Sequence, residues 1–161
     1  MKRVNFCAWS TTLKVETIIV CILLIGLLVW MGYNCFGINQ TVSIPNFLFG
    51  AIIIILILLT SWLLSPQYIE STEDSLIIHL IGFKYVIKKE DIVGIECYKQ
   101  TTSTFRVFAI GGLFGNVGLF MNNNIGTFIA FVTDFSHSYI IRRNNKKSIV
   151  ISVDDISILH T

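Results

Sequence analysis

The clearest pattern along the chain is a stretch of 53 residues, from position 17 to position 69, that carries no formal charge. Two almost continuous apolar runs, residues 17–33 and 46–64, lie within it. As α-helices they would rise about 25 Å and about 28 Å, which is close to the ~30 Å hydrocarbon core of a bilayer. The pattern therefore predicts two transmembrane helices, at residues 17–33 and 46–65.

The residues between the two runs are polar and contain turn formers. Residues 34–45 include Gly37, Pro45 and several Asn, Gln and Ser side chains, which predicts a short reversal on the far side of the membrane. Trp30, Tyr33 and Trp62 stand near the ends of the runs, where the headgroup region suits amphipathic rings. The two helices are therefore expected to form a hairpin.

The basic residues predict how this hairpin is oriented. Lys2, Arg3 and Lys14 precede the first run, residues 34–45 contain no Lys or Arg, and further lysines follow the second run. Basic loops stay in the cytoplasm, so both termini are expected there, with residues 1–16 as a cytoplasmic tail of a multi-pass inner-membrane protein. A cleaved signal peptide is the alternative reading of the first 30 residues, although no small-residue cleavage site follows them.

From residue 66 the pattern changes to short β-rich runs separated by turn residues, which predicts a cytoplasmic β-domain over residues 66–161. Within residues 76–81, alternation places Leu76, Ile78 and Leu80 on one face, the face expected to be internal. Residues 154–160 are expected to form a short helix. Tight turns favour antiparallel pairing into a bent sheet or partial barrel capped by that helix. The expected strands are residues 68–70, 76–81, 84–88, 92–99, 105–110, 127–133, 139–142 and 148–153.

Composition excludes some classes of protein. The 161 residues are 53% hydrophobic and 14% charged, with a mean hydropathy of +0.71, which does not fit a simple water-soluble globule. The part after residue 66 carries nine basic and nine acidic residues, so it has no electrostatic footprint for nucleic acid. The four cysteines fall in four different compartments of the predicted topology, so no pair is positioned to form a disulfide, and the sequence has no C-x-x-C spacing for a zinc site.

Several motifs in the β-rich part carry a family resemblance. They are the run from Arg106 to Gly118, then Gly126, Thr133-Asp134 and the segment 151–155. With these motifs, residues 66–161 resemble the bacterial pleckstrin-homology-like (PH-like) domain family, whose module commonly follows two membrane spans. The resemblance implies two roughly orthogonal antiparallel sheets, or a partial barrel, and a short C-terminal capping helix. It does not imply a particular ligand.

The glycine-rich run within these motifs has three interpretations. A phosphate cradle would need the Lys-Ser/Thr of a Walker loop or a strand-to-helix transition, and neither is present. A connector would use the glycines for positive φ and close packing. A contact surface would use the apolar side chains, which are too many for a small core to bury easily. The candidate binding residues of the run are Gly111, Gly112, Phe114, Gly115, Gly118 and Phe120.

The remaining candidates are charged. Arg106 is the single charge in an apolar strand, and it either faces outward or pairs with Asp134 or Glu96. A compact basic hairpin serves either solubility or attraction to anionic lipid headgroups. It consists of Arg142, Arg143, Lys146 and Lys147.

No constellation in the sequence predicts catalysis. His79, His137 and His160 have no spacing that requires them to converge on a metal. Asp134, Ser136 and His137 are adjacent in one loop, a spacing that rarely gives the geometry of a catalytic triad. The predicted spans contain no ionisable acid, base or histidine for a proton or ion pathway.

The sequence therefore predicts a non-enzymatic, membrane-anchored binding or scaffolding module without metal or cofactor. Its β-domain is expected to bind a protein partner or the anionic lipid surface, and not nucleic acid. The alternative is a subunit of a membrane enzyme or transport complex that uses Gly111 to Gly118 as a ligand or substrate loop.

Overall fold

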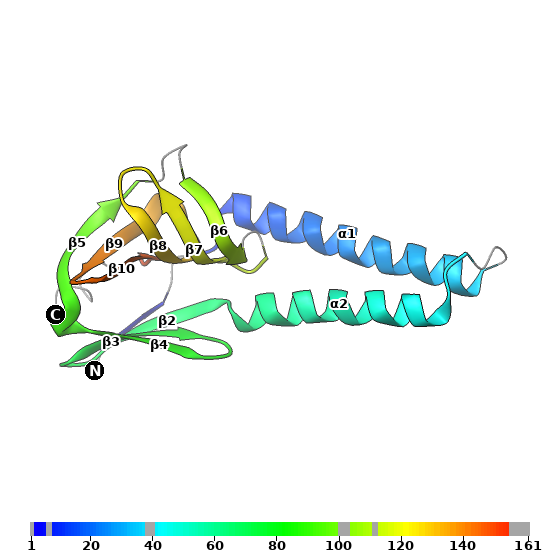
Figure 1. The fold of residues 1–161 in the computed structure, drawn as a ribbon. Helices are drawn as coiled ribbons and strands as arrows, with labels where there is room; N and C mark the ends of the chain where they lie inside the picture. Colours follow the sequence, from blue (N-terminus) through cyan, green and yellow to red (C-terminus); the bar gives the residue numbers. More distant parts are fainter. Residues whose placement is uncertain (1, 6–7, 38–40, 100–103, 111–112, 155–161) are drawn as a thin grey trace.

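The computed structural model describes residues 2–5, 8–37, 41–99, 104–110 and 113–154, and it contains a helical hairpin and a β-domain (Figure 1). The helices are α1 (Thr11–Phe36) and α2 (Ile44–Leu63), with 3-10 turns η1 (Lys89–Asp91) and η2 (Phe135–His137). The strands are β1 (Lys2–Asn5), β2 (Pro66–Ser71), β3 (Ser75–Leu80), β4 (Lys84–Lys88), β5 (Ile92–Tyr98), β6 (Thr104–Ile110), β7 (Asn116–Asn122), β8 (Gly126–Val132), β9 (Ser138–Arg143) and β10 (Lys146–Ser152).

The two helices run side by side in opposite directions and project away from the β-domain (Figure 1). Both are long and apolar enough to cross a membrane. Most of their large apolar side chains are exposed, as at Ile22 and Val29, so a hydrocarbon environment would cover them. Near the distal end the rings of Phe36 and Phe47 meet edge to face, with centroids 5.6 Å apart.

Helix α1 begins earlier than its apolar run predicts. Ser10 is the N-cap, and its Oγ accepts a hydrogen bond from the backbone N–H of Leu13 (3.2 Å). If α1 stood apart from the β-domain, its first turns would be exposed. Leu13 is buried instead. The cap and this contact extend the helix six residues beyond the predicted start at residue 17.

The first sheet has the strand order β1-β2-β3-β4 and is antiparallel throughout. Its edge strand β1 comes from the segment that was expected to be a tail, and it pairs with β2 so that Arg3 lies opposite Glu70. Leu76, Ile78 and Leu80 are all buried, which confirms the predicted register of β3.

The second sheet has the order β5-β9-β10-β8-β7-β6. Strand β10 lies between β8 and β9 and pairs with β8 in parallel. The expectation that consecutive strands pair antiparallel is therefore wrong at β8 and β9. After β8 the chain passes through η2 and forms β9 one strand position away, and β10 then turns back into the position between them.

The sequence pattern does not predict strand β7, because none of the three interpretations of the glycine-rich run makes it a strand. It pairs antiparallel with both β6 and β8, in the interior of the second sheet. Gly118 lies opposite Ala109 on β6 and Ala130 on β8, and its φ of +140° is accessible to glycine and rarely to other residues. The glycine and asparagine residues of β7 weaken its strand pattern in the sequence, since both residue types are depleted in strands.

Two apolar clusters hold the β-domain together. One joins the inner faces of the two sheets and includes Ile78, Ile87, Phe131 and Ile149. The other lies on the opposite face of the second sheet, around Phe128. The two sheets do not close into a barrel in the described ranges, and this arrangement agrees with the predicted PH-like fold. The capping helix is expected at residues 154–160, and all of these residues except Asp154 lie outside the described residues.

Candidate functional site

The glycine-rich segment lies where the helices meet the β-domain. The backbone N–H of Phe114 donates to Oγ1 of Thr17 on α1 (3.4 Å), and the carbonyl of Phe114 accepts from Oγ of Ser65, just after α2 (3.0 Å). Phe114 has a φ of +60°, which is uncommon for a bulky residue and persists only where its surroundings impose it. The segment therefore fastens the domain to the near ends of both helices.

Gly115 completes this junction. A Cβ at this position would lie 3.1 Å from Cδ of Pro66, and the φ of Gly115 is +154°. The ring of Trp9 meets the ring of Phe114 edge to face at 5.9 Å. Because packing and hydrogen bonds within the chain engage these groups, this part of the run is poorly suited to cradle a phosphate. Gly111 and Gly112 lie outside the described residues.

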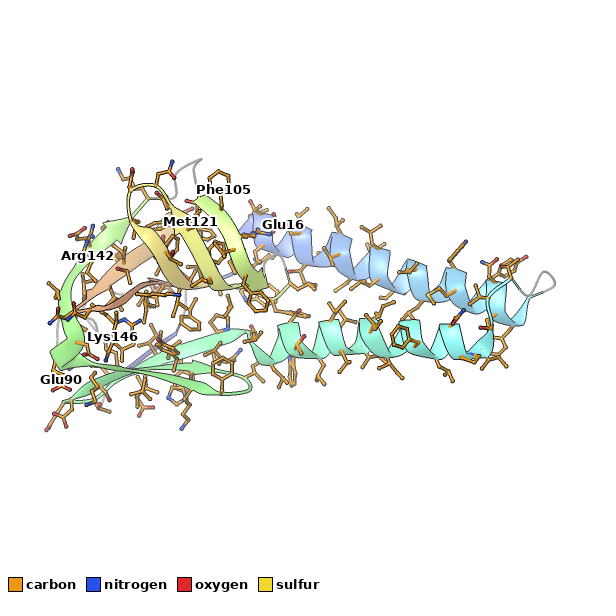
Figure 2. All side chains as sticks on the ribbon, in the orientation of Figure 1. Glu16, Glu90, Phe105, Met121, Arg142 and Lys146 are labelled. Carbon is orange, nitrogen blue, oxygen red and sulfur yellow. The ribbon has the colours of Figure 1, made fainter. Side chains whose placement is uncertain are left out.

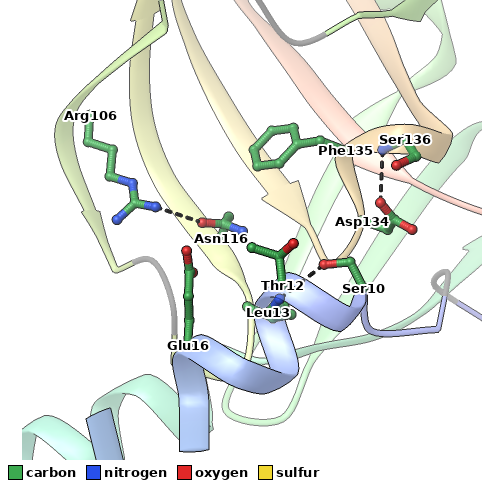
Figure 3. A pocket seen from close by; sticks show the side chains of 9 residues that line it. All are labelled: Ser10, Thr12, Leu13, Glu16, Arg106, Asn116, Asp134, Phe135 and Ser136. Atoms are coloured by element: carbon green, nitrogen blue, oxygen red, sulfur yellow. Dashed lines mark hydrogen bonds between the residues drawn. The ribbon is translucent and has the colours of Figure 1, made fainter. Parts of the chain in front are cut away.

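Beside the first turns of α1 there is a cleft of about 220 Å³ (Figure 3). It lies between α1, β6, β7 and the η2 segment, and the residues of α1 that line it are at least 90 positions away in sequence from the lining residues of the β-domain. The backbone N–H of Ser10 donates to the carbonyl of Thr133 (3.4 Å), which holds the start of α1 against this side of the domain. The lining residues are Ser10, Thr12, Leu13, Glu16, Arg106, Asn116, Asp134, Phe135 and Ser136.

Side chains of both charges face this cleft. Nη2 of Arg106 donates to Oδ1 of the buried Asn116 at 3.5 Å, and Oδ1 of Asp134 accepts from the backbone N–H of Ser136 at 2.8 Å. The carboxylate of Glu16 points into the same space (Figure 3) and makes no hydrogen bond or ion pair with any residue of the described ranges. The cleft therefore combines one guanidinium with two carboxylates.

Of the two interpretations of Arg106, the outward-facing one agrees with the structure, since Arg106 is exposed, and the acidic pair does not. Asp134 lines the same cleft without forming an ion pair with Arg106, and Glu96 instead pairs with Arg142 (3.2 Å). Glu16 and Asn116 were not predicted from sequence. Glu16 had one signal, since it is the last charge before the uncharged stretch, but only the fold brings it near Arg106.

The basic hairpin lies at the end of the β-domain away from the helices, where Figure 2 labels Arg142 and Lys146. Nζ of Lys146 is 2.6 Å from Oδ2 of Asp91, and this hydrogen bond holds the pKa of Asp91 below its usual value. Arg143 donates to the carbonyl of Lys147. Since Arg142 pairs with Glu96, three of the four basic residues have polar partners within the β-domain. These contacts, and the distance of the basic hairpin from the helices, do not favour attraction to lipid headgroups.

The apolar residues at the end of the run divide between core and surface. Phe120 is only 3% exposed and stacks on Phe128, with ring centroids 5.9 Å apart, so it packs in the core. Gly118 lies beside β6 at a distance that leaves no room for a side chain. Met121 on the other face of β7 is 44% exposed.

Strand β6 adds to this exposed face. Register pairs Phe105 with Met121 and Phe108 with Leu119, and Val107 lies at the bulge between them. Phe105 is 57% exposed, Val107 54% and Phe108 84%. Figure 2 labels Phe105 and Met121 close together. We call Phe105, Val107, Phe108 and Met121 the β6–β7 patch.

The histidines of the described residues are not arranged in a Ser-His-Asp triad. Nδ1 of His137 is 3.7 Å from Oδ2 of Asp134, but Ser136 contacts Asp134 through its backbone, so no serine-to-histidine relay is formed among them. His79 is buried, with Nε2 at 2.9 Å from Oε2 of Glu70. No group of three or more His, Cys, Asp or Glu side chains in the described part could hold a metal ion.

Comparison with known proteins identifies the family. Residues 67–161, more than half of the chain, match the family model described as "Bacterial PH domain". The chain therefore belongs to the bacterial PH domain family, in agreement with the resemblance of its motifs. No curated protein and no solved structure matches the chain.

Proposed function

We propose that this chain is a non-enzymatic, membrane-anchored binding module whose helical hairpin holds a PH domain at the cytoplasmic face of the inner membrane, where the domain binds a protein partner. The observation that carries the proposal is the β6–β7 patch. Four large apolar side chains gathered on neighbouring strands favour an interaction site, because isolated exposed apolar residues are common but contiguous patches are not.

The position of β6 suggests how the partner binds. Strand β6 is the last strand of the second sheet, so its outer edge has no partner strand among the described residues. An extended apolar segment could add to this edge through main-chain hydrogen bonds while the patch receives its side chains. Fully burying a side chain of this size contributes about 1.5 to 3 kcal/mol relative to leaving it in water.

The contacts at the junction support a retained first helix. The ring of Trp9 contacts the ring of Phe114, and Oγ1 of Thr17 accepts a hydrogen bond from the backbone N–H of Phe114. Leu13 is buried. Cleavage of a signal peptide after residue 30 would remove these contacts and strand β1 with them. A permanent hairpin with both ends on the cytoplasmic side is the simpler arrangement, and it satisfies the positive-inside rule.

Site-specific crosslinking tests the partner. With a photoreactive amino acid in place of Val107, we expect a discrete protein adduct on irradiation of intact cells. Val93 is the matched control, because it is an exposed valine on β5, the opposite edge of the same sheet. Phe108→Asp should abolish the adduct at position 107 without loss of folding. Equal adducts at 107 and 93, or lipid adducts alone at 107, would contradict the proposal.

Cysteine accessibility tests the orientation. In a variant lacking the four native cysteines, Thr41→Cys should react with a membrane-impermeant maleimide in intact spheroplasts, because residue 41 lies between the two spans. Asn144→Cys, in the distal turn of the β-domain, should react only after permeabilisation. Labelling of position 144 in intact spheroplasts would show the opposite topology.

A further inference from the structure

The cleft beside α1 has an arrangement of charge that the protein-binding proposal does not use. Glu16 and Arg106 carry opposite charges and face the same cleft, yet they form no ion pair with each other. Asp134 contributes a second carboxylate, and its side chain is 19% exposed. A ligand that carries both a positive and a negative group would complement this lining better than a simple cation or anion would.

The position of the cleft relative to the membrane indicates where such a ligand comes from. Helix α1 has 26 residues and is about 39 Å long, which exceeds the ~30 Å hydrocarbon core and leaves some of its turns outside it. The outward-facing apolar side chains start at Val15 and Ile18, next to Glu16. If the hairpin spans the membrane, the cleft therefore opens at the level of the lipid headgroups.

We propose that the cleft binds the phosphoethanolamine headgroup of a phospholipid from the adjoining leaflet. The carboxylates of Glu16 and Asp134 accept hydrogen bonds from the primary ammonium, and the guanidinium of Arg106 donates to the phosphodiester. Ser10, Thr12 and Ser136 line the same space and offer further hydroxyl groups.

The same lining discriminates between headgroups. Phosphatidylglycerol has a phosphodiester for Arg106 but no ammonium, so it leaves the Glu16 carboxylate facing an anion. Phosphatidylcholine has a cation without N–H donors, so it cannot hydrogen-bond to either carboxylate. The cleft therefore selects phosphatidylethanolamine over both.

Native mass spectrometry of the full-length chain in a non-ionic detergent tests the proposal. The delipidated protein is titrated separately with dioleoyl phosphatidylethanolamine, phosphatidylglycerol and phosphatidylcholine. We expect the ethanolamine lipid to bind at least about tenfold more tightly than the others, since a charge-assisted hydrogen bond contributes a factor of this order. Glu16→Gln should remove most of this preference, and Arg106→Gln should weaken both the ethanolamine and the glycerol lipids.

Matched variants separate binding from folding. Glu96→Gln and Arg142→Gln make the same chemical changes in an exposed ion pair at the other end of the β-domain, and they should leave all three affinities unchanged. Arg106→Lys keeps the charge and should retain part of the affinity that Arg106→Gln loses. Thermal unfolding of each variant shows whether a lost affinity reflects a lost fold.

Three results would overturn the proposal. The first is equal affinity for the three lipids, and the second is an ethanolamine preference that survives Glu16→Gln. The third is competition by soluble O-phosphoethanolamine at concentrations similar to those of the lipid, which would identify a free metabolite as the ligand. The comparison of the three lipids on the unsubstituted chain probes the cleft, and the crosslinking experiment probes the β6–β7 patch, so failure of one is distinguishable from failure of the other.

Discussion

Replacing Gly118 with alanine should destabilise the β-domain by about 3 kcal/mol or more, because overpacking and an unfavourable φ add at this position. A Cβ at this glycine would lie 2.5 Å from both Cα of Ala109 and the carbonyl oxygen of Phe108. Both are backbone atoms of β6, so relief requires the two strands to separate. The φ of +140° adds strain for any residue with a side chain.

Gly94 provides the control for this experiment. It also lies in a strand of the second sheet, but a Cβ there would meet nothing within 4 Å. Gly94→Ala should therefore be neutral, or stabilising by about 0.4 to 1 kcal/mol through the unfolded state. The measurement is urea unfolding of the full-length protein in detergent, followed by hydrogen exchange of the amides in β8 and β10. Equal effects of the two substitutions would contradict the tight pairing of β6 and β7.

Phe120→Ala should destabilise the β-domain by about 3 to 5 kcal/mol, the cost of removing a buried aromatic ring. Phe120 is 3% exposed and stacks on Phe128, which is fully buried, so its removal leaves a cavity in the second apolar cluster. The same hydrogen-exchange measurement applies.

Phe105→Ala is the matched change on the neighbouring strand. Phe105 is 57% exposed, so we expect it to alter stability by roughly 0.5 kcal/mol or less, as surface substitutions usually do. It should instead weaken the crosslink from position 107. If Phe105→Ala destabilised the domain as much as Phe120→Ala, the β6–β7 patch would be part of the core and the proposed partner site would fail.

Local patterns in the sequence determined several parts of this protein. The uncharged stretch contains two long apolar runs, and the structure has two helices there that are long and apolar enough to cross a membrane, so these helices are readable from the sequence pattern. In β3 the burial of Leu76, Ile78 and Leu80 follows from alternation, since side chains of a strand point alternately to opposite faces. The motifs from Arg106 to Asp155 were sufficient to indicate the family.

Only the tertiary structure decided the rest, because it depends on contacts between distant segments. Gly118 makes β7 hard to recognise from its strand propensity. The place of β7 in the sheet is set instead by the close approach of Gly118 to Ala109 on β6. Local sequence does not show that β10 enters between β8 and β9. The orientation of the sheets relative to the two helices also decides two further features. It places the basic hairpin far from the helices, and it brings Glu16 and Arg106 into one cleft.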